Sequence, residues 1–408
     1  MGIAFWKKHE KRATNISNDA GVQSSDPRVI ELFGLMGAQS AAGVAVNTET
    51  AMGVPAIWGA VNFLAGTLAG LPLNLYSRDG DDRKKSRGTL ASILHDAVND
   101  GMSSFQWRKH LFDQVFTGGR AFTYIERNIS GSVTNLFPLD PGKVTVKSQR
   151  GRKWYEYRED NKTTRYEPPE IIDVPFMLCA DGVAHRGPIA THKDVIGLAI
   201  AATNYGSRFF QNGGVPPFAV TGPFQTGKAA QRASDDFREA VKKAAKEERQ
   251  ALMLPDGLTI QSIGADPEKS QLVETKRFII EEVARIYSIP PTFLQDLTHG
   301  TFSNTEQEDL RLVKHTLKRW AEGFEQELNL KLFGRGRRTR FAELNMDGML
   351  RGDYQTRMEG NARAIMTGQL TPNEARQMDN RPALPNGDDL LMQGATVPLG
   401  SQEMSDDA

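Results

Sequence analysis

Cysteine is almost absent from this chain of 408 residues, and neither sign of charge is in excess. The single cysteine, Cys179, excludes an intrachain disulfide and a multi-cysteine zinc site, which fits a reducing compartment and argues against secretion. Lysine and arginine together number 50, as do aspartate and glutamate, so the formal net charge is zero. A protein that grips phosphates with its whole surface would be strongly basic, so any contact with nucleic acid must be local.

A secretion signal is also missing, and the chain has one long uncharged run. The first residues, MGIAFWKKHEKR, contain no apolar signal-peptide core, and Trp6 stands where a myristoylation signal would have Ser or Thr. The uncharged run from Ala51 to Ser77 is long enough to span a bilayer. Pro55 and Pro72 cut its helical part to about 16 residues, so a buried helix is favoured over a membrane helix.

Signatures of catalysis are lacking as well. The sequence has no GxxxxGK[ST] loop, no GxGxxG after a predicted strand and no conspicuous carboxylate cluster, so we expect neither an enzyme nor a nucleotide cofactor. Cys179, His185 and His192 lie close together in sequence, but their spacing matches no zinc pattern. A structural or solvent-exposed role is therefore favoured for them, and no metal site is expected.

What the sequence does contain is a succession of helical and strand periodicities typical of an α+β fold. Its length and its 39% hydrophobic content allow roughly two or three domains. Residues 1–49 are rich in Ala, Gly, Ser and Asn, which predicts a flexible arm. After the buried helix, helices are expected over 90–99 and 103–116. A period of two between 119 and 178 predicts a compact antiparallel sheet unit.

Two long amphipathic helices bracket a small inserted module. The first is predicted over 194–211 and stops at an Asn-Gly-Gly terminator. The second is predicted over 267–288, with a length of roughly 30 Å. Between them, residues 214–266 read as a strand, a charged helix over 227–248 and a further hairpin, which predicts a compact α/β module.

The second of these helices stops at a proline pair, and a third, longer helix follows. Pro290 and Pro291 cannot donate the intrahelical hydrogen bond, so the helix must end before them. Residues 298–304 are small and polar, and a new helix is predicted over 305–333. Its apolar stripe comprises Leu310, Val313, Leu317, Trp320, Phe324 and Leu328. The pattern fits an ordinary α+β domain with a surface loop, or a ring subunit whose helices line a channel into which the loop projects.

Three segments resemble the HK97-type portal proteins of tailed phages. VPAIWGAVNFLAGTLAGLPLNLYSR is similar to the N-terminal signature of that family, an apolar helix ending in Leu-Pro and a strand. YSIPPTFLQDLTHGTFSNTEQ resembles the region where a helix ends at a proline pair and a Thr/Ser-Asn-rich loop leads into a helix. GQLTPNEARQMDNRPALPNGDD resembles the C-terminal helix with its Asn-Glu-x-Arg. The three matches lie in the family order and span most of the chain.

This resemblance implies a portal-type α+β subunit of a ring, expected to be a dodecamer, through which double-stranded DNA enters and leaves a capsid at one vertex. The implied parts are a flexible arm (1–49), a wing of helices and antiparallel sheet (50–190), a first stem helix (191–213), a clip (214–266), a second stem helix (267–290), a tunnel loop (291–304), a tunnel/wing helix (305–333), and a wing/crown region with the C-terminal tail (334–408). Implied partners are other copies of the chain, DNA, the terminase large subunit, a head–tail adaptor and the major capsid protein, without a membrane. The implied location is the virion, with assembly in the host cytoplasm.

Candidate contact residues also follow from the resemblance. The DNA-facing part of the tunnel loop would be Thr298, His299, Gly300, Thr301, Phe302, Ser303 and Asn304. A loop that meets a moving duplex should be polar and not strongly cationic, because fixed lysine–phosphate contacts would hold the DNA. The alternative is a solvated helix–helix connection with Phe302 tucked into the core.

Two charged segments are further candidates. Docking of the packaging motor and the adaptor is expected on the clip helix, at Arg238, Glu239, Lys242, Lys243 and Lys246. The alternative is a plain solvated helix face. The basic run RGRRTR, residues 335–340, would touch packaged DNA or, as we prefer, pair with acidic groups of a neighbouring subunit. The rival function for the whole chain is a capsid or head-completion adaptor protein without a DNA channel.

Overall fold

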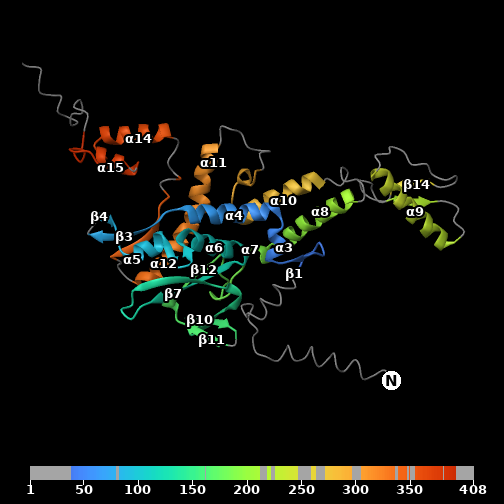
Figure 1. Cartoon of the computed structure of the whole chain (residues 1–408), viewed down its shortest axis with the longest axis horizontal. Coiled ribbons are helices and arrows are strands. Elements are labelled where there is room, and N and C mark those ends of the chain that lie inside the picture. The colour runs from blue at the N-terminus through green and yellow to red at the C-terminus, as the bar shows by residue number, and fades with distance from the viewer. Residues whose placement is uncertain are drawn as a thin grey trace, which may run out of the picture. The chain divides into compact units, whose positions relative to one another are not determined.

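The computed structural model describes a mixed helix-and-sheet protein, which confirms the expected fold class (Figure 1). The described residues are 38–79, 82–160, 162–211, 218–221, 226–246, 259–262, 272–295, 305–335, 339–346, 349, 354–379 and 381–391. The chain divides into two compact units, Met1–Leu344 and Asn345–Ala408. Within the described ranges, every helix is too short or too polar to cross a bilayer.

The core of the first unit is layered, with helices packed on strands (Figure 1). Helix α4 (Pro55–Gly70) packs on α6 (Ser104–Thr117), and α6 packs on strand β7 (Arg120–Arg127). Helix α12 (Lys318–Phe333) lies beside α6, because the Phe324 ring contacts the rings of α6, and it packs on β12 (Ile171–Pro175). Aromatic side chains thus join the two helices above the sheet.

The strands predicted between 119 and 178 form two three-stranded antiparallel sheets rather than one. One has the order β12-β7-β8, and the other β11-β10-β9. The bounds of the remaining strands are Val133–Leu139 for β8, Val144–Gln149 for β9, Arg152–Glu159 for β10 and Lys162–Tyr166 for β11. A cluster that includes Phe122, Val146, Tyr155 and Ile171 packs the two sheets together. The alternation of apolar and polar residues predicted the strands, but it did not predict how the strands divide between the two sheets.

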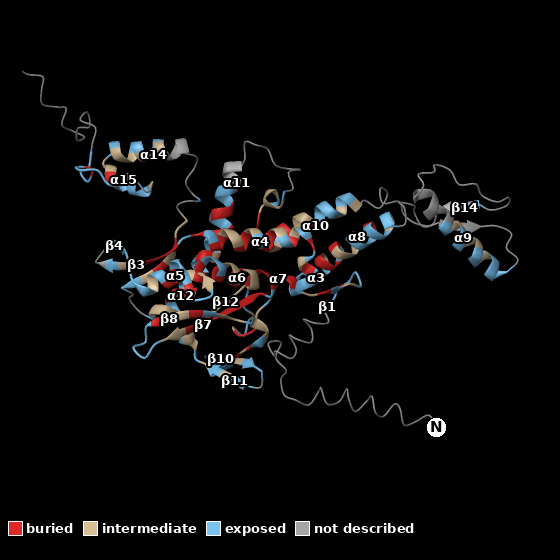
Figure 2. Cartoon of the chain, in the orientation of Figure 1, coloured by how far each residue is buried: buried red, intermediate tan, exposed pale blue. Residues whose placement is uncertain are grey.

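The uncharged run around α4 is a buried helix, as predicted. Ile57, Ala60, Leu64 and Leu68 are each at most 1% exposed, and α4 is partly red in Figure 2. The carbonyl of Leu71, directly after the helix, accepts a hydrogen bond from the guanidinium of Arg108 on α6. Burial lowers the pKa of Arg108 to about 10, but its place at the negative end of α4 favours the charged form.

A third sheet, of order β15-β3-β4, closes the other side of the unit. Its strands are β15 (Arg340–Leu344), β3 (Leu73–Asp79) and β4 (Asp82–Lys85). Helix α5 (Thr89–His95) packs on β3 and is shorter than the predicted helix over 90–99. That prediction was wrong beyond His95, because residues 97–99 form β5, which pairs with β6 (Met102–Ser103).

Further elements of the first unit are short helices and strands and several long helices. The short elements are β1 (Ala38–Gln39), β2 (Ala45–Val46), α3 (Thr48–Met52) and α7 (Pro188–Thr191). The long helices are α8 (Lys193–Gln211), α10 (Leu272–Tyr287) and α11 (Thr305–Leu312) followed by η5 (Val313–Leu317) and α12. Between α8 and α10, strand β13 (Phe218–Thr221) pairs with β14 (Thr259–Ser262), and α9 (Gly227–Lys246) lies between those strands in sequence.

The second unit contains α14 (Tyr354–Met366) and α15 (Pro372–Met378). Helix α15 begins with a capping box, in which Thr371 and Glu374 each bind the other's backbone. The Asn373 amide donates to the Leu384 carbonyl and to the Asp388 carboxylate, at 3.0 and 2.9 Å. These contacts join the Asn-Glu-x-Arg motif at the start of α15 to the turn after the helix, which contains the Pro and Gly-Asp of the sequence motif.

Candidate functional site

Helices α8 and α10 pack against each other. The sequence prediction of two long helices around an insertion corresponds to this pair. A Cβ atom on Gly206, late in α8, would lie 3.5 Å from the side chain of Leu272, at the start of α10. The end of one helix therefore lies against the beginning of the other, and the module that contains α9 leaves and returns at one end of the pair.

Helix α10 ends at Tyr287, ahead of the two prolines. Ser288 adopts a left-handed φ of 55°, and Pro291 opens the short 3-10 helix η3 (Pro291–Leu294). The Tyr287 hydroxyl donates to the Phe116 carbonyl at 2.9 Å, and burial raises the pKa of this tyrosine. The Ser288 carbonyl accepts a hydrogen bond from Thr316 of η5. The end of α10 is thereby fixed to both α6 and the helix that follows the loop.

Both flanks of residues 296–304 are held by the core, a set of contacts that we call the loop base. Before the segment, the Phe293 ring packs against Phe63 of α4 with a centroid distance of 5.1 Å. Across the segment, the Thr292 hydroxyl donates to the Glu308 carboxylate at 2.6 Å. One hydrogen bond thus joins η3 to α11, so the two ends of the loop are held together whatever lies between them.

A hollow of about 650 Å³ lies beside the loop base. Its charged lining consists of Glu281, Arg285, Glu308, Arg311 and His315. Arg285 is already paired with Glu281 at 3.0 Å and also with Glu282. The lining carries both positive and negative groups, so the described surface next to the loop is not strongly cationic.

The helix after the loop contains one widened turn, the π-helix η5. An extra residue in that turn shifts the phase between α11 and α12. Val313, Leu317, Phe324 and Leu328 are buried as predicted, but Leu310 is 41% exposed. The stripe prediction was therefore wrong at Leu310, because it assumed a regular helix and Leu312 takes the inward place.

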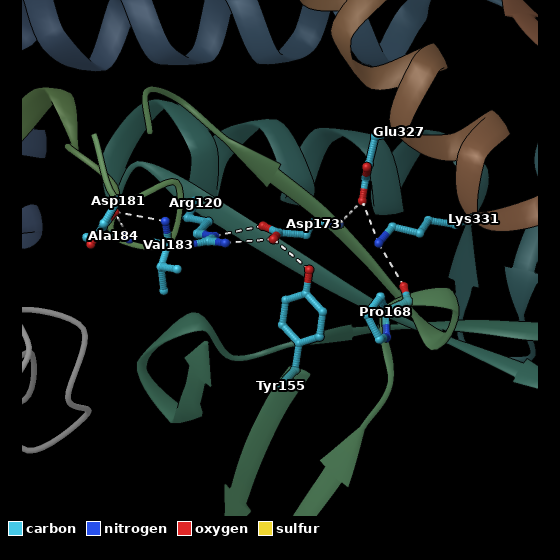
Figure 3. Close-up of polar contacts among 9 residues, drawn as sticks. All are labelled: Arg120, Tyr155, Pro168, Asp173, Asp181, Val183, Ala184, Glu327 and Lys331. Carbon is cyan, nitrogen blue, oxygen red and sulfur yellow. Dashed lines mark hydrogen bonds and ion pairs between the residues drawn. The ribbon is translucent and has the colours of Figure 1, made fainter. Parts of the chain in front are cut away.

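A buried polar network fastens α12 to the sheets (Figure 3). Arg120 of β7 forms a bidentate ion pair with Asp173 of β12, at 2.7 and 2.6 Å, and the Tyr155 hydroxyl donates to Asp173 at 2.8 Å. The Glu327 carboxylate accepts from the Asp173 backbone N–H at 2.9 Å and lies 3.3 Å from Lys331. No sequence pattern singled out this network; only the four-residue spacing of Glu327 and Lys331 could have hinted at it.

The electrostatics of the network follow from its burial. Burial and the neighbouring Asp173 carboxylate raise the pKa of Tyr155, so its hydroxyl remains a donor. Burial also raises the pKa of Glu327, although the Lys331 ammonium partly offsets that rise. Burial opposes the charge on Arg120, but the ion pair with Asp173 outweighs it and raises the pKa. The Arg120 guanidinium is therefore charged.

Comparison with known proteins decides the family. The model of the family described as "Phage portal protein" matches residues 55–380. The chain belongs to the phage portal protein family. The general function of portal proteins is to form the DNA channel of the phage particle.

Individual relatives agree with the portal assignment. The chain is 27% identical over 385 residues to the portal protein of Enterobacteria phage HK97, covering 92% of this chain and 89% of that one. It is 28% identical over 396 residues to the probable portal protein of Streptomyces phage phiC31, covering 94% and 85%.

Solved structures share the portal fold. An HK97-family portal protein from Corynebacterium diphtheriae matches with a TM-score of 0.53 and 17% identity, covering 74% of this chain and 95% of that one. The neck of a native gene transfer agent particle, computed with C12 symmetry, matches with a TM-score of 0.57 and 17% identity, covering 89% and 95%. These two likenesses concern the fold alone.

The structure describes the predicted portal contact residues in part. The tunnel-loop residues 298–304 lie outside the described ranges. In α9, Arg238 and Glu239 are exposed; Lys242, Lys243 and Lys246 belong to the helix, but their side chains lie outside what is described.

Of the basic run, the described residues are Arg335, Thr339 and Arg340. The Arg340 guanidinium lies 5.9 Å from the centroid of the Phe333 ring, and the Thr339 carbonyl accepts from the Arg78 N–H at 2.8 Å. The run therefore forms the connection between α12 and β15.

The Cys179 and His185 positions form a turn. The Cys179 N–H donates to the Ala184 carbonyl at 2.9 Å, and His185 Nε2 lies 3.2 Å from the Gly118 carbonyl oxygen. Burial lowers the pKa of His185. Over the residues that the structure describes, no three His, Cys, Asp or Glu side chains are placed to hold a metal ion.

Proposed function

We propose that this portal chain forms a dodecameric ring around a passage for double-stranded DNA at one vertex of a phage capsid. The observation that carries the proposal is the portal-family match over residues 55–380, which includes α8, α10 and both flanks of the loop. A ring requires a heterologous, head-to-tail interface that closes on itself. The C12 symmetry of the similar neck supports twelve copies.

Within that ring, we assign α8 and α10 to the stem and residues 298–304 to a tunnel loop that meets the DNA. The loop base supports this role, because it fixes both flanks through the Thr292–Glu308 hydrogen bond. The balanced charges of the adjoining hollow suit a surface that guides a duplex without holding it. Pro290 and Pro291 set the point at which the stem ends and the loop begins.

The partners belong to the same proposal. The clip, residues 214–266, would dock the terminase large subunit during packaging and a head–tail adaptor afterwards, with the exposed Arg238 and Glu239 as its described charged contacts. The wing would contact the major capsid protein. The ring would assemble in the host cytoplasm and remain in the virion, and its role needs neither catalysis nor a cofactor.

The rival function is a capsid or head-completion adaptor protein without a DNA channel. Negative-stain imaging and native mass measurement of the purified chain distinguish the two. A portal gives a closed ring with a central hole, whereas the rival gives a small particle or a shell fragment. A chain that stays as single copies would contradict the portal proposal.

Deletion of residues 298–304 tests the tunnel-loop role. Because the loop base is held by contacts outside the deleted segment, we expect rings to form normally while DNA packaging or retention falls. Packaged DNA protected from nuclease is the measurement, with a same-length Gly/Ser replacement as the companion variant. Loss of ring assembly instead would show that the segment is structural.

A further inference from the structure

A long groove lies at the β12 edge of the β12-β7-β8 sheet, between that sheet, the start of β10 and helix α12. Its volume is about 1400 Å³, which is large for a small-molecule site. All of its lining residues belong to the first unit, from Gly151 to Arg335. We call it the edge groove.

The unpaired charge in the edge groove is entirely positive. Its carboxylates are already used: Glu167 pairs with Arg165, Asp173 with Arg120 and Glu327 with Lys331. By contrast, no carboxylate among the described residues lies within ion-pair distance of the groove residues Arg152, Arg319 and Arg335. Burial lowers the pKa of Arg319, as expected for a cation that has lost water without gaining a counter-charge.

The groove also exposes apolar surface and an unsatisfied donor. Met177 is 57% exposed, Leu178 41% and Leu330 38%, and the three line the groove together. The indole N–H of Trp320 is buried without an acceptor in the described structure. An apolar surface with a cationic rim is typical of a protein–protein contact and needs a partner that supplies carboxylates and carbonyl oxygens.

The opposite edge of the same sheet presents a different surface. Strand β8 is flanked by the β5–β6 hairpin, whose Asn99 amide donates to the Leu136 carbonyl at 2.8 Å. The turn of that hairpin exposes Asp100, and Phe105 directly beyond it is 46% exposed. One exposed carboxylate and one exposed aromatic ring thus lie across the sheet from the cationic groove.

We propose that the edge groove receives the opposite, β8-edge face of a second copy of this chain. The exposed Asp100 and Phe105 of that face offer a carboxylate to the unpaired cations of the groove and an aromatic ring to its apolar surface. Two complementary faces on opposite edges of one sheet make a head-to-tail contact, which generates a ring when it closes. This inference rests on the proposed ring and specifies which surface closes it.

Charge reversal in the groove tests the contact. The variant Arg152→Glu with Arg335→Glu changes two exposed side chains of the groove, so its thermal unfolding should match that of the unchanged chain, while rings should be lost. The matched control, Arg158→Glu with Lys162→Glu, makes the same change in charge on β10 and β11 outside the groove lining and should form rings. Closed rings of the groove variant, or equal loss in the control, would overturn the proposal.

Co-expression shows whether the contact is head-to-tail. A groove variant still offers its intact opposite face, so it can join an arc but cannot accept the next copy. At about one variant copy in ten, about 30% of twelve-membered rings would contain no variant, so the yield of closed rings should fall about threefold and open arcs should accumulate. If the contact were isologous, a variant copy could not join an arc at all. The yield of closed rings would then fall only in proportion to the amount of unchanged chain, and this result would contradict the proposal.

A photoreactive residue at Met177 gives an independent measurement in the full chain. Illumination of assembled rings should yield crosslinked dimers of the chain, with the second attachment on the β8-edge face. Rings without any crosslink between copies would overturn the inference. An unchanged chain that forms no ring in the same assay would instead contradict the portal function.

Discussion

Asp173 is the residue on which the buried network depends. Its carboxylate accepts from two nitrogens of Arg120 and from the Tyr155 hydroxyl, and the ion-paired side chains are 2% and 9% exposed. Replacement by Asn would leave the Arg120 charge buried without a counter-charge. We expect Asp173→Asn to lower the free energy of unfolding by about 3 kcal/mol, measured by chemical denaturation.

An exposed ion pair provides the matched control for that change. Lys109 and Asp113 lie one helical turn apart on α6 at 2.9 Å, with both side chains about one-third exposed. Asp113→Asn should change stability by less than about 0.5 kcal/mol, because water already screens that pair. Equal effects of the two substitutions would mean that burial of the Asp173 pair has no energetic consequence.

Glu325 makes the stability of the fold depend on pH. Its carboxylate accepts the Leu344 N–H at 2.7 Å, and burial, together with Glu343 and Glu322, raises its pKa to about 7. The folded state therefore binds a proton more tightly than the unfolded state, whose carboxyl titrates at about 4.3. The resulting stabilisation is full below the unfolded pKa and is lost as the pH rises through 7.

The variant Glu325→Gln should remove this dependence, because the amide keeps an acceptor oxygen and cannot ionise. We expect it to be more stable than the unchanged chain at pH 8 and to approach it in stability near pH 4.5. Urea denaturation at the two pH values measures the difference. A constant difference across this range would show that Glu325 does not titrate between the two states.

At the scale of elements, the hydrogen bond between Thr292 and Glu308 joins the two described flanks of residues 296–304. Thr292→Val removes the hydroxyl that binds Glu308 and keeps the shape of the side chain. We expect faster hydrogen–deuterium exchange across α11, with ring assembly unchanged, because the Phe63–Phe293 and Tyr287–Phe116 contacts remain. Glu308→Gln is the companion variant, since its amide oxygen still accepts, and it should exchange more slowly than Thr292→Val.

Elements whose signals are local could be predicted from the sequence. The proline pair marked the end of α10, the Gly-rich segment marked the end of α8, and the run around Leu64 marked a buried helix. The widened turn η5 could not be predicted, because an extra residue in one turn leaves no mark in composition. The exposure of Leu310 was therefore mispredicted as well. Division of the strands into two sheets was hidden too, since alternation is the same in either sheet.

At the scale of the whole molecule, the family was readable while its surfaces were not. Three motifs in the right order pointed to a portal, and the family match covers the region between them. The network of Arg120, Asp173 and Glu327 and the edge groove join residues that are far apart in sequence. Their side chains meet only after the sheets and α12 have packed, so no local pattern announces them.

The widened turn in η5 has a consequence for how this protein can change its length. One residue in an α-helix corresponds to a rotation of about 100°. Loss of a single residue between Val313 and Leu317 would close the widened turn into a regular α-helical turn, so α11 would keep its phase relative to α12. A one-codon deletion there would therefore leave the direction of α11 unchanged, whereas the same deletion in the regular part of α12 would rotate α11 by that angle.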